Sequence, residues 1–297
     1  MTTTRLLAIA FLWLGFTQPR ASADAALESR VQALVKAHKG KVTIAVKHLL
    51  TGETLYIDAD DLMPTASLIK FPVMLEAYKQ AADGKINLAD KVTLRDKDKV
   101  PGSGILTYHF SDGASFSVRD AIRLMIVYSD NTATNLVLDK ICIPATGKRM
   151  KAWGFPGTKI HAKVFRGDTT SIDPEGTKKY GLGSTTAREM AGLFEKLHEG
   201  KLISPEATKA MLDHLKNCDD KTKLKRLLPA GTVVAHKTGS VSDVKTDAGI
   251  IYAPSGPIAI CVLTWHNTDR RFVDDNAANV LIGRVAREVF DAWGKKK

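Results

Sequence analysis

Three short segments of this chain carry residue types that could together perform acyl transfer. A serine hydroxyl is a poor nucleophile and needs a neighbouring base. Three patterns in the sequence could supply such groups: a serine and a lysine three positions apart, a second serine, and a further lysine two residues before a glycine. In chain order the segments are Ser67-Leu68-Ile69-Lys70, Ser129-Asp130-Asn131 and Lys237-Thr238-Gly239.

The first segment could supply a nucleophile and its base. Residues three apart on a helix lie on one face, so Lys70 could reach the Ser67 hydroxyl. Thr65 is a candidate N-cap, which would place Ser67 in a first turn whose N–H groups and dipole favour negative charge. Lys70 must lose its proton to act as a base, and burial or nearby cations promote this loss. The spacing alone is weak evidence, because it recurs at Ser242 and Lys245.

The second segment could handle the leaving group. Ser129 could deliver a proton to the departing atom, and Asn131 could form a hydrogen bond with a substrate amide. Asp130 could brace the loop, although a simple cap on the helix that follows would explain this segment equally well.

The third segment is predicted to lie on a strand and to bind an anion. Lys237 supplies a fixed cation, which could hold a carboxylate and help to keep Lys70 neutral. Thr238 adds a hydroxyl, and Gly239 lets a ligand approach the backbone closely. The N–H of Ser240 could complete an oxyanion hole. An ordinary edge-strand turn would also explain this segment on its own.

The three segments in this order resemble the class A β-lactamase family, within the superfamily that includes penicillin-binding proteins. The resemblance extends along essentially the whole mature chain. The stretch from Asp247 to Pro254 is similar to the late strands of the family. Asn135 matches a second asparagine that steadies a long loop beside the active site.

The resemblance implies a covalent acyl-enzyme route with no metal ion and no organic cofactor. Ser67 would attack a strained lactam carbonyl, Lys70 would accept its proton directly or through water, and Ser129 would protonate the departing nitrogen. Substrate-binding candidates are Asn131, Lys237, Thr238, Gly239, Ser240 and Lys245.

The long loop departs from the family pattern. Family β-lactamases place a glutamate there, followed four residues later by asparagine, to activate the deacylating water. Counting from Arg166 puts Asp168 at the glutamate position and Ile172 at the asparagine position. Glu175 is an alternative base, but Lys179 follows it four residues later. Three readings stay open: Asp168 as base, Glu175 as base, or no efficient deacylating carboxylate.

Apolar periodicity predicts the elements that must position these residues. The fold class is α+β: a five-stranded antiparallel sheet flanked by N- and C-terminal helices, with an inserted helical domain. The expected sheet domain is 24–63 plus 217–297, the helical domain is 64–216, and the active site lies at their interface. Predicted helices are 25–37, 67–82, 118–128, 132–140, 185–198, 205–215 and 273–293, predicted strands are 42–50, 54–57, 232–238, 248–253 and 258–265, and 162–183 is expected to be irregular.

The first 23 residues have the pattern of an export signal. Arg5 precedes an apolar run from Leu6 to Phe16, and Ala21-Ser22-Ala23 forms a small-x-small cleavage site. The run is shorter than the roughly 20 residues that span a bilayer. We expect a periplasmic or secreted protein without stable membrane insertion.

Composition narrows the choice of partners. The 297 residues are 44% hydrophobic and 25% charged, with a formal net charge of +11. The basic residues are interleaved with acids and form no basic helix, so nucleic acid is not an expected partner. We expect a monomer acting on a small β-lactam or acyl-peptide. Of the three cysteines, Cys261 lies in an apolar run, whether Cys142 and Cys218 pair stays open, and none has metal-ligand spacing.

The leading functional prediction is therefore β-lactam hydrolysis. A D-alanyl-D-alanine carboxypeptidase or an esterase of the same fold is the alternative within the same chemistry. A β-lactam sensor that is acylated without turnover is the alternative from another class. The altered long loop gives weight to both alternatives.

Overall fold

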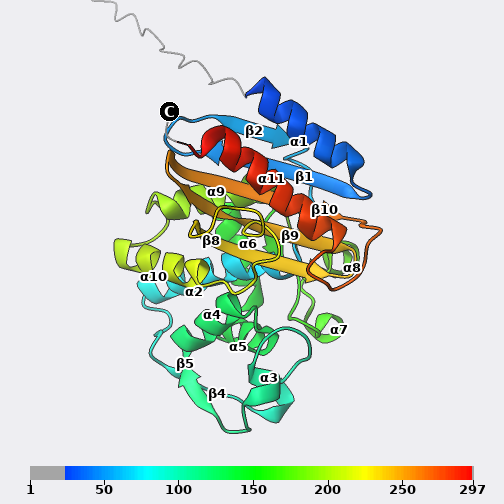
Figure 1. Cartoon of the computed structure of the whole chain (residues 1–297). Helices are drawn as coiled ribbons and strands as arrows, with labels where there is room; N and C mark the ends of the chain where they lie inside the picture. The colour runs from blue at the N-terminus through cyan, green and yellow to red at the C-terminus, as the bar shows by residue number, and fades with distance from the viewer. Residues whose placement is uncertain (1–23, 296–297) are drawn as a thin grey trace, which may run out of the picture.

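The computed structural model describes residues 24–295 and is built around one five-stranded antiparallel sheet (Figure 1). The strand order is β2-β1-β10-β9-β8, so β8 is an edge strand. Every predicted strand is present and the predicted α+β fold is confirmed. The strands are β1 (Lys41–His48), β2 (Thr54–Ile57), β8 (Val233–Val241), β9 (Val244–Ala253) and β10 (Gly256–Trp265).

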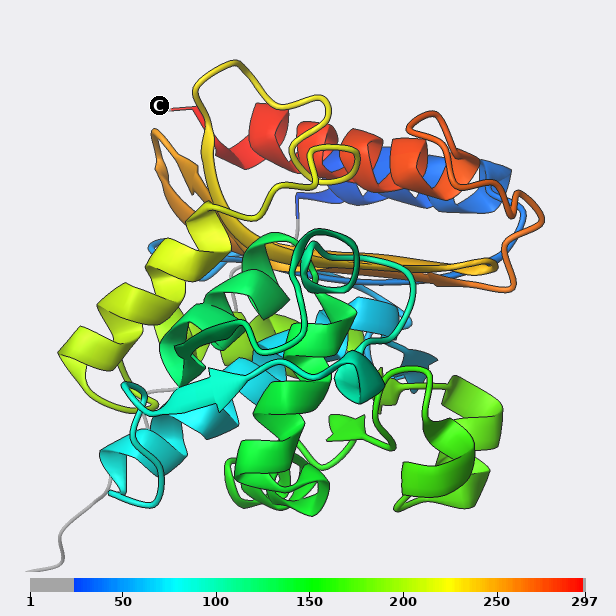
Figure 2. The ribbon, with the colours of Figure 1, turned by 90° about the horizontal axis from the view of Figure 1, so that it is seen from below.

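Helices cover both faces of the sheet (Figure 2). On one face lie α1 (Ala25–Ala37) and α11 (Ala277–Trp293), which pack against each other. On the other face α9 (Ala187–His198) contacts β1, β9 and β10. The strands are apolar on both sides for this reason: Ile260 of β10 belongs to the core beneath α1 and α11, while its neighbour Cys261 belongs to the core beneath the helical part.

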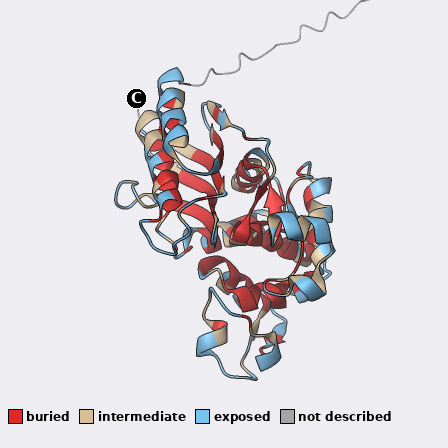
Figure 3. Ribbon diagram, turned by 90° about the vertical axis from the view of Figure 1, so that its right-hand side faces the viewer, coloured by how far each residue is buried: buried red, intermediate tan, exposed pale blue. Residues whose placement is uncertain are grey.

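The helical part is formed by the residues between β3 and β8. Its buried residues appear as a second red layer beside the sheet in Figure 3. The helix α2 runs through its centre and contacts α4, α5, α6 and α10. The division into two domains at 63/64 and 216/217 stays a prediction. The bounds are α2 (Lys70–Ala82), α3 (Leu106–His109), α4 (Val118–Val127), α5 (Asn131–Ile141), α6 (Ile143–Ala152), α10 (Pro205–Lys216), and, for the short strands, β3 (Met63–Pro64), β4 (Lys91–Thr93), β5 (Ser115–Ser117), β6 (Lys159–Ile160) and β7 (Gly183–Thr185).

Several helical regions differ from the sequence prediction. The stretch 162–183 contains α7 (Gly167–Thr170) and α8 (Pro174–Tyr180), where an irregular segment was expected. The start signal of α8 is clear in retrospect, because Asp173 accepts a hydrogen bond from Gly176 N at 2.9 Å and a proline follows it at N1. The helix α6 was also missed, because the chain turns sharply from α5 into it at Cys142, a non-glycine residue with φ of 66°.

The predicted helix 67–82 begins differently from expectation. A 3-10 turn, η1 (Ala66–Ile69), precedes α2. Thr65 takes the predicted N-cap position and Ser67 falls in the first turn, but the Thr65 side chain makes no capping hydrogen bond. Thr65 is already in the helical region at φ −94°, ψ −24°, and its hydroxyl donates to Ala66 O instead. Pro72 lies in the first turn of α2, where a missing N–H removes no helical hydrogen bond.

Within 24–295, no helix combines the length and the apolar character needed to cross a membrane. The proposed export signal, 1–23, lies outside the described residues.

Candidate active site

Ser67 lies on η1, which the edge of the sheet holds in place. Gly239 of β8 approaches this turn so closely that a Cβ there would lie 2.4 Å from Thr65 O. Thr246 of β9 donates a hydrogen bond to the same carbonyl at 2.9 Å. Ala66 adopts φ of 46°, a conformation that costs a non-glycine residue about 1 kcal/mol or more. The surrounding contacts must offset that cost, and the result is a partly exposed Ser67 hydroxyl at the sheet edge.

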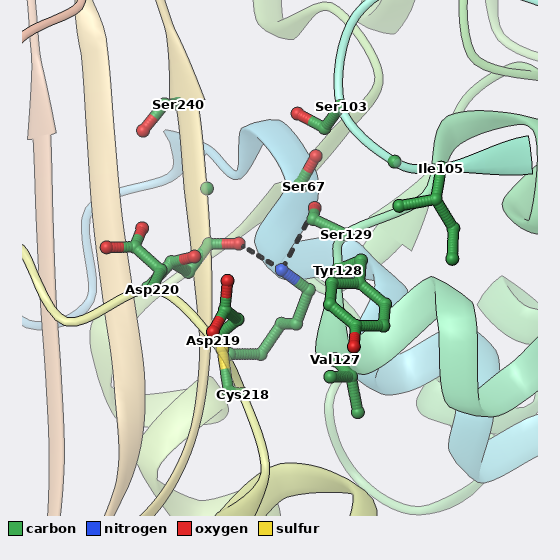
Figure 4. A pocket seen from close by; sticks show the side chains of 14 residues that line it. Ser67, Ser103, Ile105, Val127, Tyr128, Ser129, Cys218, Asp219, Asp220 and Ser240 are labelled. Carbon is green, nitrogen blue, oxygen red and sulfur yellow. Dashed lines mark hydrogen bonds between the residues drawn. The ribbon is translucent and has the colours of Figure 1, made fainter. Parts of the chain in front are cut away.

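Two cavities meet at Ser67. Both are also lined by Ser103 and Ser240, so together they form one cleft between β8 and the helical part. The larger, of about 690 Å³, extends toward the long loop, Trp265 and Phe272. The smaller, of about 280 Å³ and shown in Figure 4, is lined by Ser67, Ser103, Gly104, Ile105, Val127, Tyr128, Ser129, Cys218, Asp219, Asp220, Lys237, Thr238, Gly239 and Ser240.

Ser129 enters the cleft from the turn between α4 and α5. Its φ is 53°, and the next residue, Asp130, fixes the turn on both sides. Asp130 Oδ1 caps α5 by accepting from Ala133 N at 2.8 Å. Its Oδ2 accepts from the N–H groups of Ile105 and Leu106 at 2.7 and 2.8 Å. The cap and the loop brace considered from the sequence are therefore both present.

Lys70 is fully buried and turns its amine toward Ser129. Its Nζ lies 2.6 Å from Ser129 O, 3.2 Å from Ser129 Oγ and 2.8 Å from Asn131 Oδ1. Among the hydrogen bonds of the described residues none joins Lys70 to the Ser67 hydroxyl, so the direct contact expected from helical spacing is not made. Burial lowers the pKa of Lys70 well below its ordinary value, and the cation of Lys237 lowers it further, against the opposing effect of Asp130.

Lys237 approaches the same hydroxyl from the other side. It is fully buried on β8, and its Nζ donates to Ser129 Oγ at 3.1 Å and to Thr238 O at 2.7 Å (Figure 4). Burial lowers its pKa too, although Cys218, Asp220 and Asp247 act in the opposite direction. The Ser129 hydroxyl thus lies between two amines, in the wall of the cavity that Ser67 lines.

The three oxygen contacts of Lys70 fit an ammonium, which can donate to all three, and they also fit a neutral amine. A neutral amine has two N–H donors and one lone pair, and an ammonium has three donors and no acceptor. In the neutral form, which the lowered pKa of Lys70 favours, the two N–H groups can donate to Ser129 O and Asn131 Oδ1, neither of which carries a proton. The lone pair then faces the Ser129 O–H, whose oxygen can accept from Lys237. This arrangement can move a proton from a hydroxyl to Lys70.

Comparisons with known proteins identify the family to which the chain belongs. The family model described as "Beta-lactamase enzyme family" matches residues 26–293. The chain belongs to this family. A β-lactamase of Bacteroides uniformis is 29% identical over 300 residues, which cover 93% of this chain and 94% of that protein. The solved structure of a β-lactamase from Sphaerobacter thermophilus DSM 20745 is 29% identical, with a TM-score of 0.79 over 91% of this chain and 97% of that one. A mutant of PBP-A, solved as an acyl-enzyme complex with penicillin G, is 26% identical, with a TM-score of 0.80 over 93% and 98% of the two chains.

Two further candidate residues, Asn131 and Lys245, have hydrogen-bond partners within the protein. Asn131 donates its Nδ2 to Pro101 O at 2.9 Å while its Oδ1 faces Lys70, so both ends of the amide are engaged within the protein. Lys245 donates to Val241 O at 2.6 Å and to Ser242 O, and it lines neither cavity at Ser67. Thr238 lines the smaller cavity as expected.

The long loop is fastened beside the cleft, as its resemblance to the family implies. Asn135 clamps it through both ends of its amide, donating to Val164 O at 3.0 Å and accepting from Val164 N at 2.9 Å. Phe165 and Gly167 of the loop line the larger cavity. Asp168 on α7 is exposed and lines neither cavity at Ser67, and exposed Glu175 on α8 lines a separate hollow.

Several lining residues were not singled out as site residues from the sequence. The smaller cavity is also lined by Ser103, Asp219 and Asp220. These residues lie on loops, and the hydrophobic periodicity of a sequence does not predict the path of a loop. Cys218, considered only for pairing, lines it as well, and the structure has all three cysteines free, with Cys142 exposed and Cys218 buried.

Proposed function

We propose that this protein hydrolyses β-lactams through a covalent acyl-enzyme formed on Ser67. The carrying observation is the Ser129 hydroxyl held between the amines of Lys70 and Lys237, in the cavity that Ser67 lines. Such a site offers a nucleophile, a neutral base and a proton carrier together, as nucleophilic catalysis requires.

Acylation would proceed in two linked proton transfers. Ser67 Oγ attacks the lactam carbonyl, and its proton passes to Lys70 through Ser129 or a water molecule. As the C–N bond breaks, Ser129 delivers a proton to the departing nitrogen and is reprotonated by Lys70. The product is an ester on Ser67, which water hydrolyses to release the ring-opened acid.

Substrate would be held by the edge strand. The Lys237 cation and the Thr238 hydroxyl suit a substrate carboxylate. The N–H groups of Ser67 and Ser240 are proposed to hold the oxyanion, each contributing about 3–4 kcal/mol in comparable sites. β8 has a partner on one side alone, which leaves alternate N–H groups free to point out of the sheet.

The N-terminal signal pattern supports export, and we propose that the mature protein acts outside the cytoplasm on a small molecule. A serine mechanism, a monomeric state and the absence of a metal ion are parts of the same proposal.

The test is to follow the purified protein with a chromogenic cephalosporin by colour and by intact mass. We expect colour development with multiple turnovers and a transient mass increase of one acyl group. A stable adduct formed in a single turnover would indicate a β-lactam sensor instead. The absence of both colour and adduct would contradict the proposal, and assaying D-alanyl-D-alanine peptides and small esters would then test the remaining alternatives.

The identity of the base for deacylation needs a separate proposal, because it depends on where the carboxylates of the long loop lie. Neither Asp168 nor Glu175 lines a cavity at Ser67. This supports the third possibility, that the protein has no efficient deacylating carboxylate. We expect the penicillin adduct to decay slowly enough to be followed by mass but still completely, so that turnover repeats, at a rate that neither Asp168→Asn nor Glu175→Gln changes. Timed intact-mass spectra after removal of free penicillin measure this decay. Slowing by about a hundredfold in one variant would identify that residue as the base.

A further inference from the structure

The larger cavity at Ser67 is lined by four aromatic side chains. They come from the long loop, from β10 and from the segment that joins β10 to α11: Phe165, Tyr180, Trp265 and Phe272. The cavity of about 690 Å³ is continuous with the proposed nucleophile, and its volume is typical of sites that bury most of a small-molecule ligand. The proposed acyl-transfer chemistry does not by itself explain this aromatic lining.

Tyr180 and Trp265 form a wall that other rings hold in place. Both side chains are half-buried, and their ring centroids are 5.7 Å apart. The imidazole of His161 stacks on Tyr180 with centroids 6.4 Å apart, and that of His266 stacks on Trp265 at 4.1 Å. The wall therefore has its shape before any ligand enters, which lowers the entropy cost of binding.

Phe165 presents its ring to the same cavity from the long loop, with 66% of the residue exposed. Its neighbour Val164 is the residue that Asn135 clamps, and on its other side Arg166 donates to Lys97 O at 2.5 Å. The ring also packs against Gly102, where a Cβ would lie 3.2 Å from the phenylalanine Cε2. The position of this exposed aromatic is therefore fixed by contacts on both sides.

Phe272 presents a second exposed ring, with 71% of the residue accessible. The ring centroid lies 4.7 Å from Lys245 Nζ, and Lys245 is held by its hydrogen bond to Val241 O at 2.6 Å. The backbone just before the ring is fastened as well, since Asn276 Nδ2 donates to Arg271 O at 3.0 Å. An apolar side chain held in contact with water at a cavity is a candidate for contact with a ligand.

The charged residues that line the cavity are engaged within the protein. There are three, each with a partner: Lys163 with Asp139, Lys179 with the Tyr180 ring at 5.0 Å, and Asp243 with His266 at 3.8 Å. A charged group that entered the cavity would lose hydration without gaining an unpaired opposite charge, which is unfavourable. An uncharged, apolar occupant suits the cavity better.

We propose that the larger cavity binds an uncharged aromatic ring on the acyl side of the substrate, and that Phe165 and Phe272 determine this specificity. The inference rests on the proposed function, because acylation of Ser67 would place the acyl group at the cavity that Ser67 lines. Aromatic rings favour offset-stacked and edge-to-face contacts with one another, and the lining rings can provide both. The preferred substrates are β-lactams whose side-chain amide carries an aryl group.

Two penicillins that differ by one ring measure the preference. Benzylpenicillin has a phenylacetyl side chain, whereas methylpenicillin has an acetyl group there and is otherwise identical. The wild-type protein receives both at equal concentration, and mass spectrometry gives the ratio of the two adducts or of the two hydrolysis products. We expect benzylpenicillin to be favoured about tenfold or more, as burial of a phenyl group predicts.

Variants of the two phenylalanines test which residues cause the preference. Phe165→Ala and Phe272→Ala should each lower the ratio about threefold or more by slowing benzylpenicillin, with methylpenicillin changed less than about twofold. Phe110→Ala is the matched control, because Phe110 is a partly exposed aromatic that lines neither cavity at Ser67, and it should leave the ratio unchanged. A penicillin with a carboxylate beside the phenyl ring should lose most of the preference.

A binding measurement separates this inference from the proposed function. Calorimetric titration of Ser67→Ala with each penicillin measures affinity without acylation, and the same preference and the same loss in Phe272→Ala are expected. Equal reaction and equal binding of the two penicillins, or a preference that neither phenylalanine variant lowers, would overturn the inference. A wild-type protein that neither acylates nor hydrolyses would refute the proposed function, and binding of the two penicillins would still decide whether the cavity selects an aromatic ring.

Discussion

Ser67→Ala is expected to reduce turnover of a chromogenic cephalosporin by about 10⁴-fold or more, and to abolish the acyl adduct in intact-mass spectra. The substitution removes the attacking oxygen and leaves the contacts of Lys70 and Lys237 with Ser129 in place, because none of these hydrogen bonds involves Ser67. The protein should therefore fold normally while losing the reaction. Initial rates and adduct mass, measured on the same preparation, check both expectations.

A matched control separates this chemical effect from a change in the shape of the cleft. Ser103 lines both cavities with an exposed side chain, and no catalytic role is proposed for its hydroxyl. Ser103→Ala should keep most of the activity. Hydrolysis that persists in Ser67→Ala, with an adduct on another residue, would show that the nucleophile has been assigned wrongly.

The sheet and its flanking helices were predictable because local patterns determine them. Helix α1 matches its predicted bounds, since Asp24 caps it by accepting from Ala26 N and Leu27 N and apolar residues recur at helical spacing. The late strands were recognisable from apolar and β-branched runs, although β8 and β9 extend beyond their predicted ends to Val241 and back to Val244. The turn that joins β8 and β9 was not recognised from the sequence, because polar residues interrupt the apolar pattern at the ends of both strands.

The details of the nucleophile turn were not predictable from local sequence. Ala66 is an unremarkable residue by type, and its positive φ is held by contacts from Gly239 and Thr246, which lie far away along the chain. Helical spacing indicated that Lys70 lies on the same side as Ser67. It could not indicate that Ser129 and Asn131 engage the amine, because that depends on how α2 packs against α5.

His236 is a second example of a residue whose direction follows from local sequence while its contacts depend on distant parts of the chain. Strand alternation predicted that His236 points away from the cleft, and its bond to Asp247 agrees with that prediction. Nothing local linked it to Asp247, because that contact depends on the pairing of β8 with β9. The same limit applies to Asp168 and Glu175, whose positions depend on two short helices that the sequence analysis treated as irregular chain.

Lys70→Arg should slow acylation by about 10²–10⁴-fold, because arginine places a permanent cation where lysine supplies a base. A guanidinium retains its proton throughout the accessible pH range, whereas burial and Lys237 lower the pKa of Lys70. For the wild type, acylation should fall as the pH falls through that lowered value, since the neutral amine is then lost. The arginine variant should lack this pH dependence, which stopped-flow acylation from pH 4.5 to 8 would reveal.

Lys70→Met is the partner variant that decides between a base and a simple positive charge. If Lys70 served only as a cation, arginine would restore acylation and methionine would not. If it serves as a base, both variants should be slow, because neither can accept a proton from Ser67 or Ser129. Arginine also needs more room at a fully buried site, so near-UV circular dichroism should accompany the kinetics to show that the core is intact. Acylation of Lys70→Arg at the wild-type rate would contradict the proton-transfer route and leave the neutral amine without a role.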